Sequence, residues 1–496
     1  MHMDLTDVTE HLDLTAVIPE GYAAYRKAVG EGMAYFLAHL APERLEAILL
    51  QQMTWPADAT PAERVVAVMR ECPTLHKLGQ VLAHDPRLDP GFRRHLHELE
   101  MFDSSLDPVL VEQTIRAELG PQMQHYGIEL EVSGTLEASV AFVVPCRYRD
   151  PHTGRGGEAM LKVVKPDLAQ RLDEELAILD GVADLLDQRR EAYGIPAFRY
   201  RETFATVRAL LQGETDQSRE QRHLREAVER YAGVQRVKVP ALLPFSTPLL
   251  TAMEYIHGQP VTEIVESGVS VRARRQIAAA IVRSLMADAI FTHRADTIFH
   301  ADPHSGNLFA MADGRVAILD WSLAGHLGKA EREHLVDAFL GAVQLDVEAT
   351  VAAISRLALR IEDPQALRET VAQALEHIWH DQLPDTEWFT RLFEDLLAAG
   401  VQFSSEMLLF RKTLFILQGV LQEIDPECSS ARVMVGEAMA WLLAEWPGRY
   451  LALPWSRAFA SQLSNADLMR LYLGVPVTVG RFWWSRVLGL GRGAKR

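Results

Sequence analysis

Three oxygen-bearing side chains lie close together in the second half of the chain. Asp302 and Asn307 belong to the stretch HADPHSGNLF at residues 300–309, and Asp320 directly follows the apolar run VAIL at residues 316–319. Phosphoryl transfer asks the protein mainly for positioning and charge, with one carboxylate near the attacking hydroxyl and oxygen ligands that hold Mg²⁺ against the phosphates. Asn307 follows Asp302 at the separation found in kinase catalytic loops. We therefore predict a phosphoryl-transfer site in which Asp302 serves the nucleophile and Asn307 and Asp320 bind Mg²⁺.

The same residues also have a plainer interpretation. Asp-Pro pairs are common in turns, so residues 302–307 could form a turn and a surface loop, with Asp320 an unrelated carboxylate at a strand end. The combination of this loop with the following strand is less common, and it favours the phosphoryl-transfer interpretation. His300 and His304 could act as a general base or as metal ligands. We expect instead that both support the loop through hydrogen bonds.

The elements that must position these residues change type along the chain. Residues 1–125 carry apolar residues at helical spacing. Residues 128–164 alternate and are rich in β-branched residues around the turn sequence DPHTGRGG, which predicts a hairpin with Lys162 in its second strand. Helical spacing returns after Pro166 and includes a helix from about residue 216 to 231, and residues 330–455 have a helical pattern throughout. These patterns predict an α+β protein.

Composition narrows the class of protein. A chain of 496 residues is too long for one ordinary domain, so we expect two or three units. A formal net charge of −17 argues against a nucleic-acid partner. The cysteines Cys72, Cys146 and Cys428 are too scattered for a disulfide framework or a zinc site, and each is expected to be a small buried hydrophobic residue. The sequence shows neither a signal-peptide pattern nor a long apolar run, so we expect a cytoplasmic location.

Several motifs together resemble the UbiB/AarF family of atypical kinases. They are, in chain order, Lys77, Gly79 and Gln80 in a KxGQ motif, Lys162 in AMLKVVKP, Glu214 and Asp216 in an ExD motif with Glu220 after them, MEYIHGQP with Glu254 and Tyr255, the FHADPHSGN loop, and RKTLFILQGVLQEIDP at residues 411–426. The resemblance covers roughly residues 70–430. One such motif alone would be weak evidence, but their order and spacing agree over several hundred residues.

The resemblance implies a protein-kinase-like fold with two lobes. The boundaries expected from it are a helical extension with the KxGQ motif at residues 1–125, a small β-containing N-lobe at 126–257, a mostly helical C-lobe with the catalytic loop at 258–455, and a basic and aromatic tail at 456–496. It further implies that the chain binds ATP and Mg²⁺. Its activity would be that of an atypical kinase or an ATPase.

The resemblance also assigns roles to individual residues. Lys162 would contact the nucleotide phosphates, with Glu220 paired behind it, and a compact ammonium charge suits that role. Lys77 would lie over the nucleotide site near Glu214 and Asp216 and restrict access of a protein substrate. The remaining nucleotide contacts implied by the resemblance are Gln80, Ala138, Ser139, Glu254 and Tyr255.

The chain departs from the family pattern in three places. The nucleotide loop reads GTLEASVAFVV, and a carboxylate at Glu137 would repel phosphates unless it points away or meets a cation. The metal motif is Asp-Trp-Ser, so Trp321 must fill a larger apolar space and Ser322 replaces a residue able to take positive φ freely. The C-terminal tail is interrupted by Arg481 and Arg486, and its final 16 residues carry five basic residues and the aromatic residues Phe482, Trp483 and Trp484. This composition suits either a peripheral membrane contact or packing on the C-lobe.

The leading hypothesis is an ATP-binding, Mg²⁺-dependent enzyme that hydrolyses ATP or phosphorylates a small or lipid-like molecule in isoprenoid quinone, lipid or specialised metabolism. Its expected partners are ATP, a small-molecule or lipid-like substrate or activator, and other biosynthetic enzymes. Peripheral contact with the inner membrane surface through the tail is an additional expectation. Two alternatives stay open: a degenerate kinase that acts as a scaffold, and an antibiotic-type small-molecule phosphotransferase.

Overall fold

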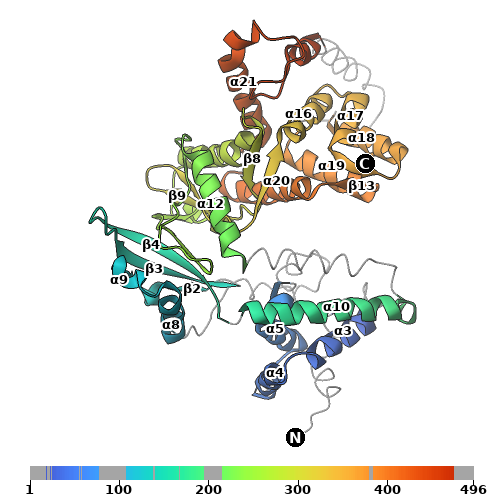
Figure 1. Ribbon diagram of the computed structural model, residues 1–496. Helices are drawn as coiled ribbons and strands as arrows, with labels where there is room; N and C mark the ends of the chain where they lie inside the picture. The colour runs from blue at the N-terminus through green and yellow to red at the C-terminus, as the bar shows by residue number, and fades with distance from the viewer. Residues whose placement is uncertain are drawn as a thin grey trace. The chain divides into compact units, whose positions relative to one another are not determined.

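The chain forms two compact units in the computed structural model (Figure 1). The first unit comprises Met1–Gln221 and Leu242–Tyr255, and the second comprises Arg222–Ala241 and Ile256–Arg496. The structure describes residues 18, 23, 25–54, 56, 59–77, 108–137, 140–166, 168–194, 215–378 and 384–473. Helices and several small sheets occur together, as expected for an α+β protein.

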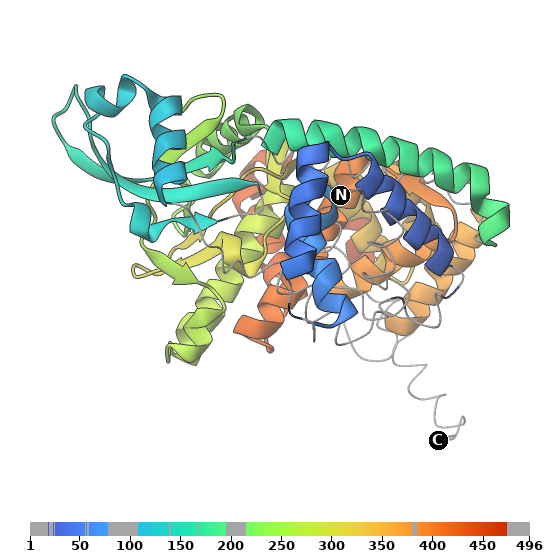
Figure 2. The ribbon, with the colours of Figure 1, turned by 90° about the horizontal axis from the view of Figure 1, so that it is seen from below.

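Part of the first unit is helical. Its helices are α3 (Arg26–Ala38), α4 (Pro42–Thr54), α5 (Pro61–Glu71) and the long α10 (Leu168–Tyr193). Both ribbon views show α10 lying beside α3 (Figures 1 and 2). The apolar residues of these helices share one core, in which Leu37 and Val68 are completely buried. Thr60 begins α5 with a capping box, since its hydroxyl accepts from the Glu63 N–H and the Glu63 carboxylate accepts from the Thr60 N–H.

The other part of the first unit is an antiparallel sheet of five strands. The strands are β1 (Glu129–Leu130), β2 (Leu136–Glu137), β3 (Ala141–Arg149), β4 (Gly156–Val164) and β6 (Leu250–Glu254), in the order β1-β3-β4-β6 with β2 also paired to β3. The hairpin predicted from residues 128–164 is confirmed as β3 and β4. The buried face of the sheet shares a core with α8 (Pro108–Leu119) and α9 (Gln122–His125). Cys146 belongs to this core, and burial raises the pKa of its thiol to about 12.

The sheets of the second unit carry the predicted catalytic loop. A four-stranded sheet has the order β5-β10-β9-β7, formed by β5 (Val237–Lys238), β7 (Gly258–Pro260), β9 (Leu308–Met311) and β10 (Val316–Ile318). A separate pair joins β8 (Asp296–His300) to β11 (Ala324–Gly328). β9 and β10 follow the loop and pair antiparallel as a hairpin. The loop therefore leaves one sheet at the end of β8 and enters the other at β9.

Helices make up most of the rest of the second unit. They are α12 (Gln217–Tyr231, whose first residues belong to the first unit), α13 (Glu263–Glu266), α14 (Val271–Val282), a π-helical turn (Arg283–Ala287), α15 (Asp288–Ile290), α16 (Lys329–Val343), α17 (Val347–Leu357), α18 (Pro364–Ile378), α19 (Thr386–Ala398), α20 (Ser405–Ile424) and α21 (Ser430–Arg449). Among the residues that the structure describes, no helix is both long and apolar enough to span a membrane.

The prediction of a helical pattern throughout residues 330–455 was wrong in one respect. β12 (Ala358–Ile361) and β13 (Val401–Phe403) form a two-stranded antiparallel sheet. β12 begins immediately after α17, and Gly400, with φ of 82°, separates α19 from β13. Strands of three or four residues are too short for their alternation to be told from the adjoining helices. A second correction concerns Cys428, which is only partly buried, whereas Cys72 and Cys146 are buried as expected.

Candidate functional site

His300 ties the predicted catalytic loop to the predicted metal aspartate. Its ring is completely buried, and Nε2 lies 2.9 Å from the Leu319 carbonyl oxygen and 2.8 Å from that of Asp320. Carbonyls only accept, so Nε2 carries the proton, and Nδ1 is free to accept from the Asp302 N–H at 3.2 Å. Burial lowers the pKa of His300, which favours this neutral tautomer. The supporting role expected for His300 agrees with these contacts.

Asn307 and Asp320 are brought together by backbone pairing. Asn307 Nδ2 donates to the Asp302 carbonyl at 3.1 Å, and the Leu319 N–H donates to the Asn307 carbonyl at 2.8 Å. The first bond engages the amide nitrogen and leaves the amide oxygen as the ligand atom, and the second places Asp320 next to Asn307. One carboxylate and one amide oxygen fit Mg²⁺, which usually takes few protein ligands and completes its shell with phosphates and water. Within the described ranges there is no group of three or more His, Cys, Asp or Glu residues that could hold a metal by themselves.

Asp320 itself has a left-handed backbone, with φ of 51°. Asp tolerates this conformation because its short side chain can bond to nearby backbone groups. Here Oδ1 accepts from the Ser322 N–H at 3.1 Å. The carboxylate is therefore held by the turn that follows it.

Trp321 fills a closed apolar space, as expected for the Asp-Trp-Ser motif. Its side chain is 1% exposed, and its ring meets that of His300 edge-on with centroids 4.9 Å apart. Trp321 Nε1 donates to the Ile318 carbonyl at 3.2 Å, and the Trp321 carbonyl lies 3.0 Å from Nδ1 of His223 on α12. Trp321 thus connects the metal motif with β10 and with α12.

The predicted catalytic loop is also supported by α20, which sequence reasoning missed. Lys412 Nζ lies 2.9 Å from Asp302 Oδ1, and the Thr413 hydroxyl donates to the His300 carbonyl at 3.0 Å. Asp302 and Lys412 are both partly exposed, with 36% and 44% of their side chains accessible. Both α20 residues belong to RKTLFILQGVLQEIDP, one of the motifs that resemble the UbiB/AarF family. That sequence was the available signal, but it gave no indication that the lysine meets the loop.

In the first unit, Lys162 and Glu220 form a buried ion pair. Lys162 Nζ lies 2.9 Å from Glu220 Oε2 and 3.1 Å from Oε1, and both side chains are less than a tenth exposed. Lys162 lies on the central strand β4, opposite Thr251 on β6. The Thr251 hydroxyl donates to Gln217 Oε1 at 2.8 Å, so the first turn of α12 is bonded to the same sheet. The ammonium is thereby held in place from both the strand and the helix.

The other predicted nucleotide contacts are less fully described. Asp216 Oδ1 accepts from the Arg219 N–H at 2.9 Å at the start of α12. Glu254 is the last residue of β6, and the Tyr255 N–H donates to the Glu158 carbonyl. Lys77 is helical and partly buried. Gln80, Ala138, Ser139 and Glu214 lie outside the described residues, as do Arg481 and Arg486 of the tail.

A buried carboxylate anchors the segment that leads into the KxGQ motif. Glu175 on α10 is completely buried, and its Oε2 accepts from the Thr74 N–H at 2.8 Å and from the Thr74 hydroxyl at 2.6 Å. Its other oxygen pairs with Arg44 on α4. Thr74 precedes Lys77 in the same short helix. Sequence reasoning missed this anchor because a glutamate within LDEELAIL reads as part of a solvated helix face.

Comparison with known proteins identifies the fold of this chain as kinase-like. Residues 104–354 match the ABC1 atypical kinase-like domain. The chain therefore belongs to this family, as its resemblance to the UbiB/AarF proteins predicted.

Two curated relatives and one solved structure show the extent of the similarity. The chain is 22% identical over 375 residues to the probable protein kinase UbiB of Xanthomonas campestris pv. campestris (strain B100), with 72% of this chain and 65% of the relative covered. It is 26% identical over 318 residues to the chloroplastic protein ACTIVITY OF BC1 COMPLEX KINASE 1 of Arabidopsis thaliana, covering 62% of this chain and 44% of the relative. It thus spans less than two thirds of either relative's length. The structure of Rv3197 from Mycobacterium tuberculosis, a complex with erythromycin, shares its fold at a TM-score of 0.51 and 17% identity over 78% of this chain and 95% of that one.

Proposed function

We propose that this chain is an ATP-dependent phosphotransferase or ATPase that requires Mg²⁺ and acts on a small or lipid-like molecule in isoprenoid quinone, lipid or specialised metabolism. The observation that carries the proposal is the hydrogen bonding of His300, which holds both the Asp302 N–H and the Asp320 carbonyl. One residue thereby fixes the loop expected to serve the nucleophile relative to the aspartate expected to bind the metal. Catalysis of phosphoryl transfer depends mainly on such positioning.

Each side chain has a defined role in this proposal. Asp302 orients the attacking hydroxyl or water and accepts its proton. Asn307 and Asp320 supply oxygen ligands for Mg²⁺, which neutralises the charge of the phosphates when it is bound. Lys162, kept in place by Glu220, binds phosphate oxygens with its ammonium group. We propose further that Lys77, Gln80, Glu214 and Asp216 restrict access to the nucleotide, and that Ala138, Ser139, Glu254 and Tyr255 contact it.

The proposal is tested by phosphate release from ATP at millimolar Mg²⁺ by the purified chain. Asp302→Asn should lower release by about 10² to 10⁴-fold, because a general base contributes roughly that factor. Asp320→Asn should abolish release while the protein remains folded. Asp313→Asn is a matched control, since Asp313 is exposed and pairs only locally with Arg315 in the turn between β9 and β10.

The assay also separates the alternatives. Binding of ATP with release that depends on Asp320 supports an enzyme, and a screen of hydroxyl-bearing small molecules with labelled ATP then distinguishes an acceptor from water. No binding and no release at millimolar Mg²⁺ and ATP would instead favour a kinase-like scaffold.

A further inference from the structure

The second unit contains an open pocket whose wall is built mainly from arginine. Its volume is about 430 Å³, and the residues that line it are Arg236, Arg272, Arg275, Gln276, Ala279 and Arg283. None of these residues is acidic, although the whole chain has a formal net charge of −17. None of the residues assigned to ATP or Mg²⁺ lines this pocket. The gathering of positive charge in an acidic protein therefore needs an explanation of its own.

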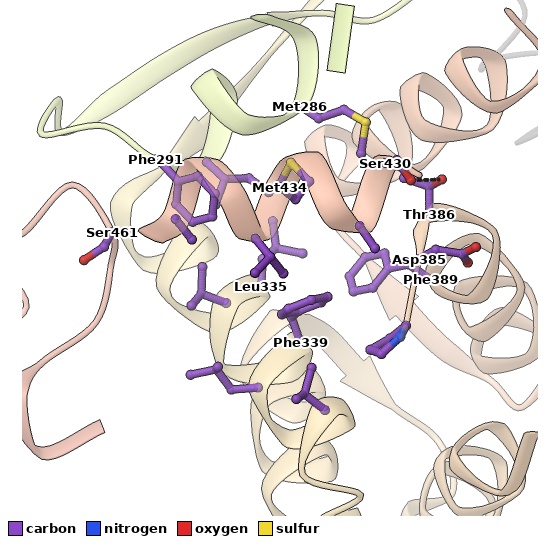
Figure 3. A pocket seen from close by; sticks show the side chains of 18 of the residues that line it. Met286, Phe291, Leu335, Phe339, Asp385, Thr386, Phe389, Ser430, Met434 and Ser461 are labelled. Atoms are coloured by element: carbon purple, nitrogen blue, oxygen red, sulfur yellow. Dashed lines mark hydrogen bonds between the residues drawn. The ribbon is translucent and has the colours of Figure 1, made fainter. Parts of the chain in front are cut away.

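A cavity elsewhere in the same unit has the opposite character. It measures about 310 Å³ and lies among α16, α19, α20 and α21, with Leu335, Phe339, Phe389 and Met434 around its middle (Figure 3). None of the described residues that line it is Lys or Arg. An apolar wall of this kind selects no particular ligand, whereas a wall of guanidinium groups selects for negative charge.

Most of the pocket's arginines share one face of a helix. Arg272, Arg275, Ala279 and Arg283 follow one another along α14 and into the π-helical turn at intervals of three or four residues. That spacing puts side chains on the same face of a helix. Ala279 lies between the longer side chains and has only a methyl group, so it forms the floor of the pocket.

The remaining wall comes from a different element. Arg236 lies in the turn before β5, and its carbonyl oxygen accepts from the Val316 N–H of β10 at 3.0 Å. α14 packs against β10. A helix and a strand pair thus fix the backbones that carry the arginines, and such rigid elements hold a ligand more precisely than loops do.

Two of the guanidinium groups are available without the loss of an existing contact. Arg236 and Arg272 are exposed, and in the part of the chain that the structure describes neither side chain forms an ion pair or a hydrogen bond. Positive charges around one pocket repel each other. An anion bound between them therefore stabilises this arrangement.

The other two arginines form ion pairs that a ligand can replace. Arg275 pairs with Glu427 and, at 3.8 Å, with Asp425, and Arg283 Nε lies 2.6 Å from Glu437 Oε1. The side chains of Arg275 and Arg283 are 53% and 42% exposed, and exposed pairs contribute little to stability. Within the described ranges Arg283 engages only Nε, so its terminal nitrogens can also donate to a ligand.

The arrangement of these groups favours phosphate over other anions. A phosphoryl group presents oxygens in several directions, so guanidinium groups on different elements can bond to it together, whereas the two oxygens of a carboxylate lie in one plane. Nucleic acid or an anionic membrane surface would also meet the negative charge of the rest of the chain. A small anion avoids that repulsion because it reaches only the pocket.

We propose that this pocket binds one small soluble anion that carries two or more phosphate groups. Arg236 and Arg272 donate to its terminal oxygens from two sides, and Arg275 and Arg283 donate to the remaining oxygens as their exposed ion pairs loosen. The site goes beyond the proposed ATP chemistry, because it involves none of the residues assigned to the nucleotide or to Mg²⁺.

The test is calorimetric titration of the purified full-length chain with inorganic pyrophosphate, in buffer freed of divalent cations. We expect saturable binding of one pyrophosphate per chain. The double variant Arg236→Ser with Arg272→Ser should bind at least about tenfold more weakly, because charge-assisted hydrogen bonds are lost. The matched control is Arg225→Ser with Arg470→Ser, which removes two charges from exposed positions outside the pocket and should bind like the unchanged chain.

A second pair of variants locates the ligand independently. Ala279→Glu puts a carboxylate into the floor of the pocket and should also weaken pyrophosphate binding at least about tenfold. Ala273→Glu adds the same charge to the first turn of the same helix, outside the pocket, and should leave binding almost unchanged. Circular dichroism checks that each variant is folded, and if Ala279→Glu is not, the variants at the exposed arginines still decide.

Two further ligands identify the chemistry. Citrate, a small anion whose charges are all carboxylates, should bind several-fold more weakly than pyrophosphate. Vesicles that contain phosphatidate should sediment the unchanged chain and the variant with Arg236→Ser and Arg272→Ser to the same extent.

Four results would overturn the proposal. One is the absence of saturable pyrophosphate binding to the full-length chain. Another is an equal effect of the two double variants, which would place pyrophosphate at another site, such as the predicted nucleotide site. Citrate binding as tight as that of pyrophosphate would contradict the assignment to phosphate. Vesicle binding that requires Arg236 and Arg272, without binding of pyrophosphate, would mean that the pocket meets a membrane.

Discussion

The buried pair of Lys162 and Glu220 gives the most quantitative prediction. At an effective dielectric constant of about 20, the attraction between two charges 2.9 Å apart is at most about 6 kcal/mol, and each ion also loses several kcal/mol of hydration on burial. Glu220→Gln removes the attraction but leaves the ammonium buried. We expect this substitution to lower the free energy of unfolding by about 3 to 5 kcal/mol.

The double variant separates the pair's interaction from the cost of burying its partners. Lys162→Met should destabilise the first unit by a similar amount because it leaves a buried carboxylate without its cation. Lys162→Met with Glu220→Leu removes both charges of the pair, so its loss of stability should be far smaller than the sum of the two single losses. If Lys162 binds phosphate as proposed, ATP binding should be lost in Lys162→Met and should not return in the double variant, because both lack the ammonium group.

The measurement is thermal unfolding of the four proteins followed by circular dichroism. A loss of about 3 to 5 kcal/mol corresponds to a decrease in Tm of roughly 6 to 20 °C for a unit of this size. Glu112→Gln is the matched control, since Glu112 lies 2.7 Å from Arg116 in an exposed pair on α8. That substitution should cost no more than about 0.5 kcal/mol. The reasoning fails if Glu220→Gln costs no more than Glu112→Gln, or if the two single losses simply add.

Substitutions at three further residues test the second unit. Because burial lowers the folded pKa of His300 below its ordinary value of 6.5, the unfolded chain takes up that proton first and stability decreases as pH falls below 6.5. His300→Phe should remove this dependence in urea titrations at several pH values, and should cost about 1 to 3 kcal/mol at pH 8 through the lost hydrogen bonds. Lys412→Ala removes a half-exposed ion pair, so Tm should change by less than about 2 °C. The proposed ATP turnover should fall several-fold in this variant and recover in Lys412→Arg. Unchanged turnover in Lys412→Ala would contradict a role of Lys412 at the loop. Burial raises the pKa of Asp288 to about 6 from 3.8, opposed by Arg230 and assisted by Glu437, so the folded state favours the neutral acid and stability decreases as pH rises from about 4 to about 6. Asp288→Asn should therefore raise the free energy of unfolding by about 3 kcal/mol at pH 8 and by almost nothing at pH 3. An equal gain in stability at both pH values would show that the ionisation of Asp288 is not its cause.

The parts of the fold that the sequence predicted correctly are those with a local signal. The β3 and β4 hairpin has nine residues in each strand, a burial pattern that alternates over part of each strand, and a glycine-rich turn, so its pairing could be predicted directly. A DGR turn joins β9 to β10. β12 and β13 have no comparable signal, because each is very short and their pairing depends on tertiary contacts.

The residues of the candidate site also differ in whether the nearby sequence indicates their place. Asp302 and Asn307 could be proposed from their spacing within one loop, and Asp320 could be proposed because it directly follows a strand. Lys412 reaches the loop from a helix far along the chain, and nothing near it in the sequence indicates which carboxylate it meets. Glu175 was missed for a similar reason, because its burial depends on Arg44 and on the segment that begins at Thr74.

The departure at Asp-Trp-Ser is compatible with an intact metal site. The concern at Ser322 was that glycine alone takes positive φ freely, but in this structure the residue with positive φ is Asp320, and the backbone of Ser322 supports it through the bond to Oδ1. Trp321 occupies its larger space without exposing the ring and adds a contact with His300, the residue that fixes the loop. Two sequence changes that could suggest a degenerate kinase therefore leave the Asp320 carboxylate bonded to the backbone of the following turn. If the chain does not turn over ATP, the cause has to be sought in the nucleotide loop around Glu137 rather than in the metal motif.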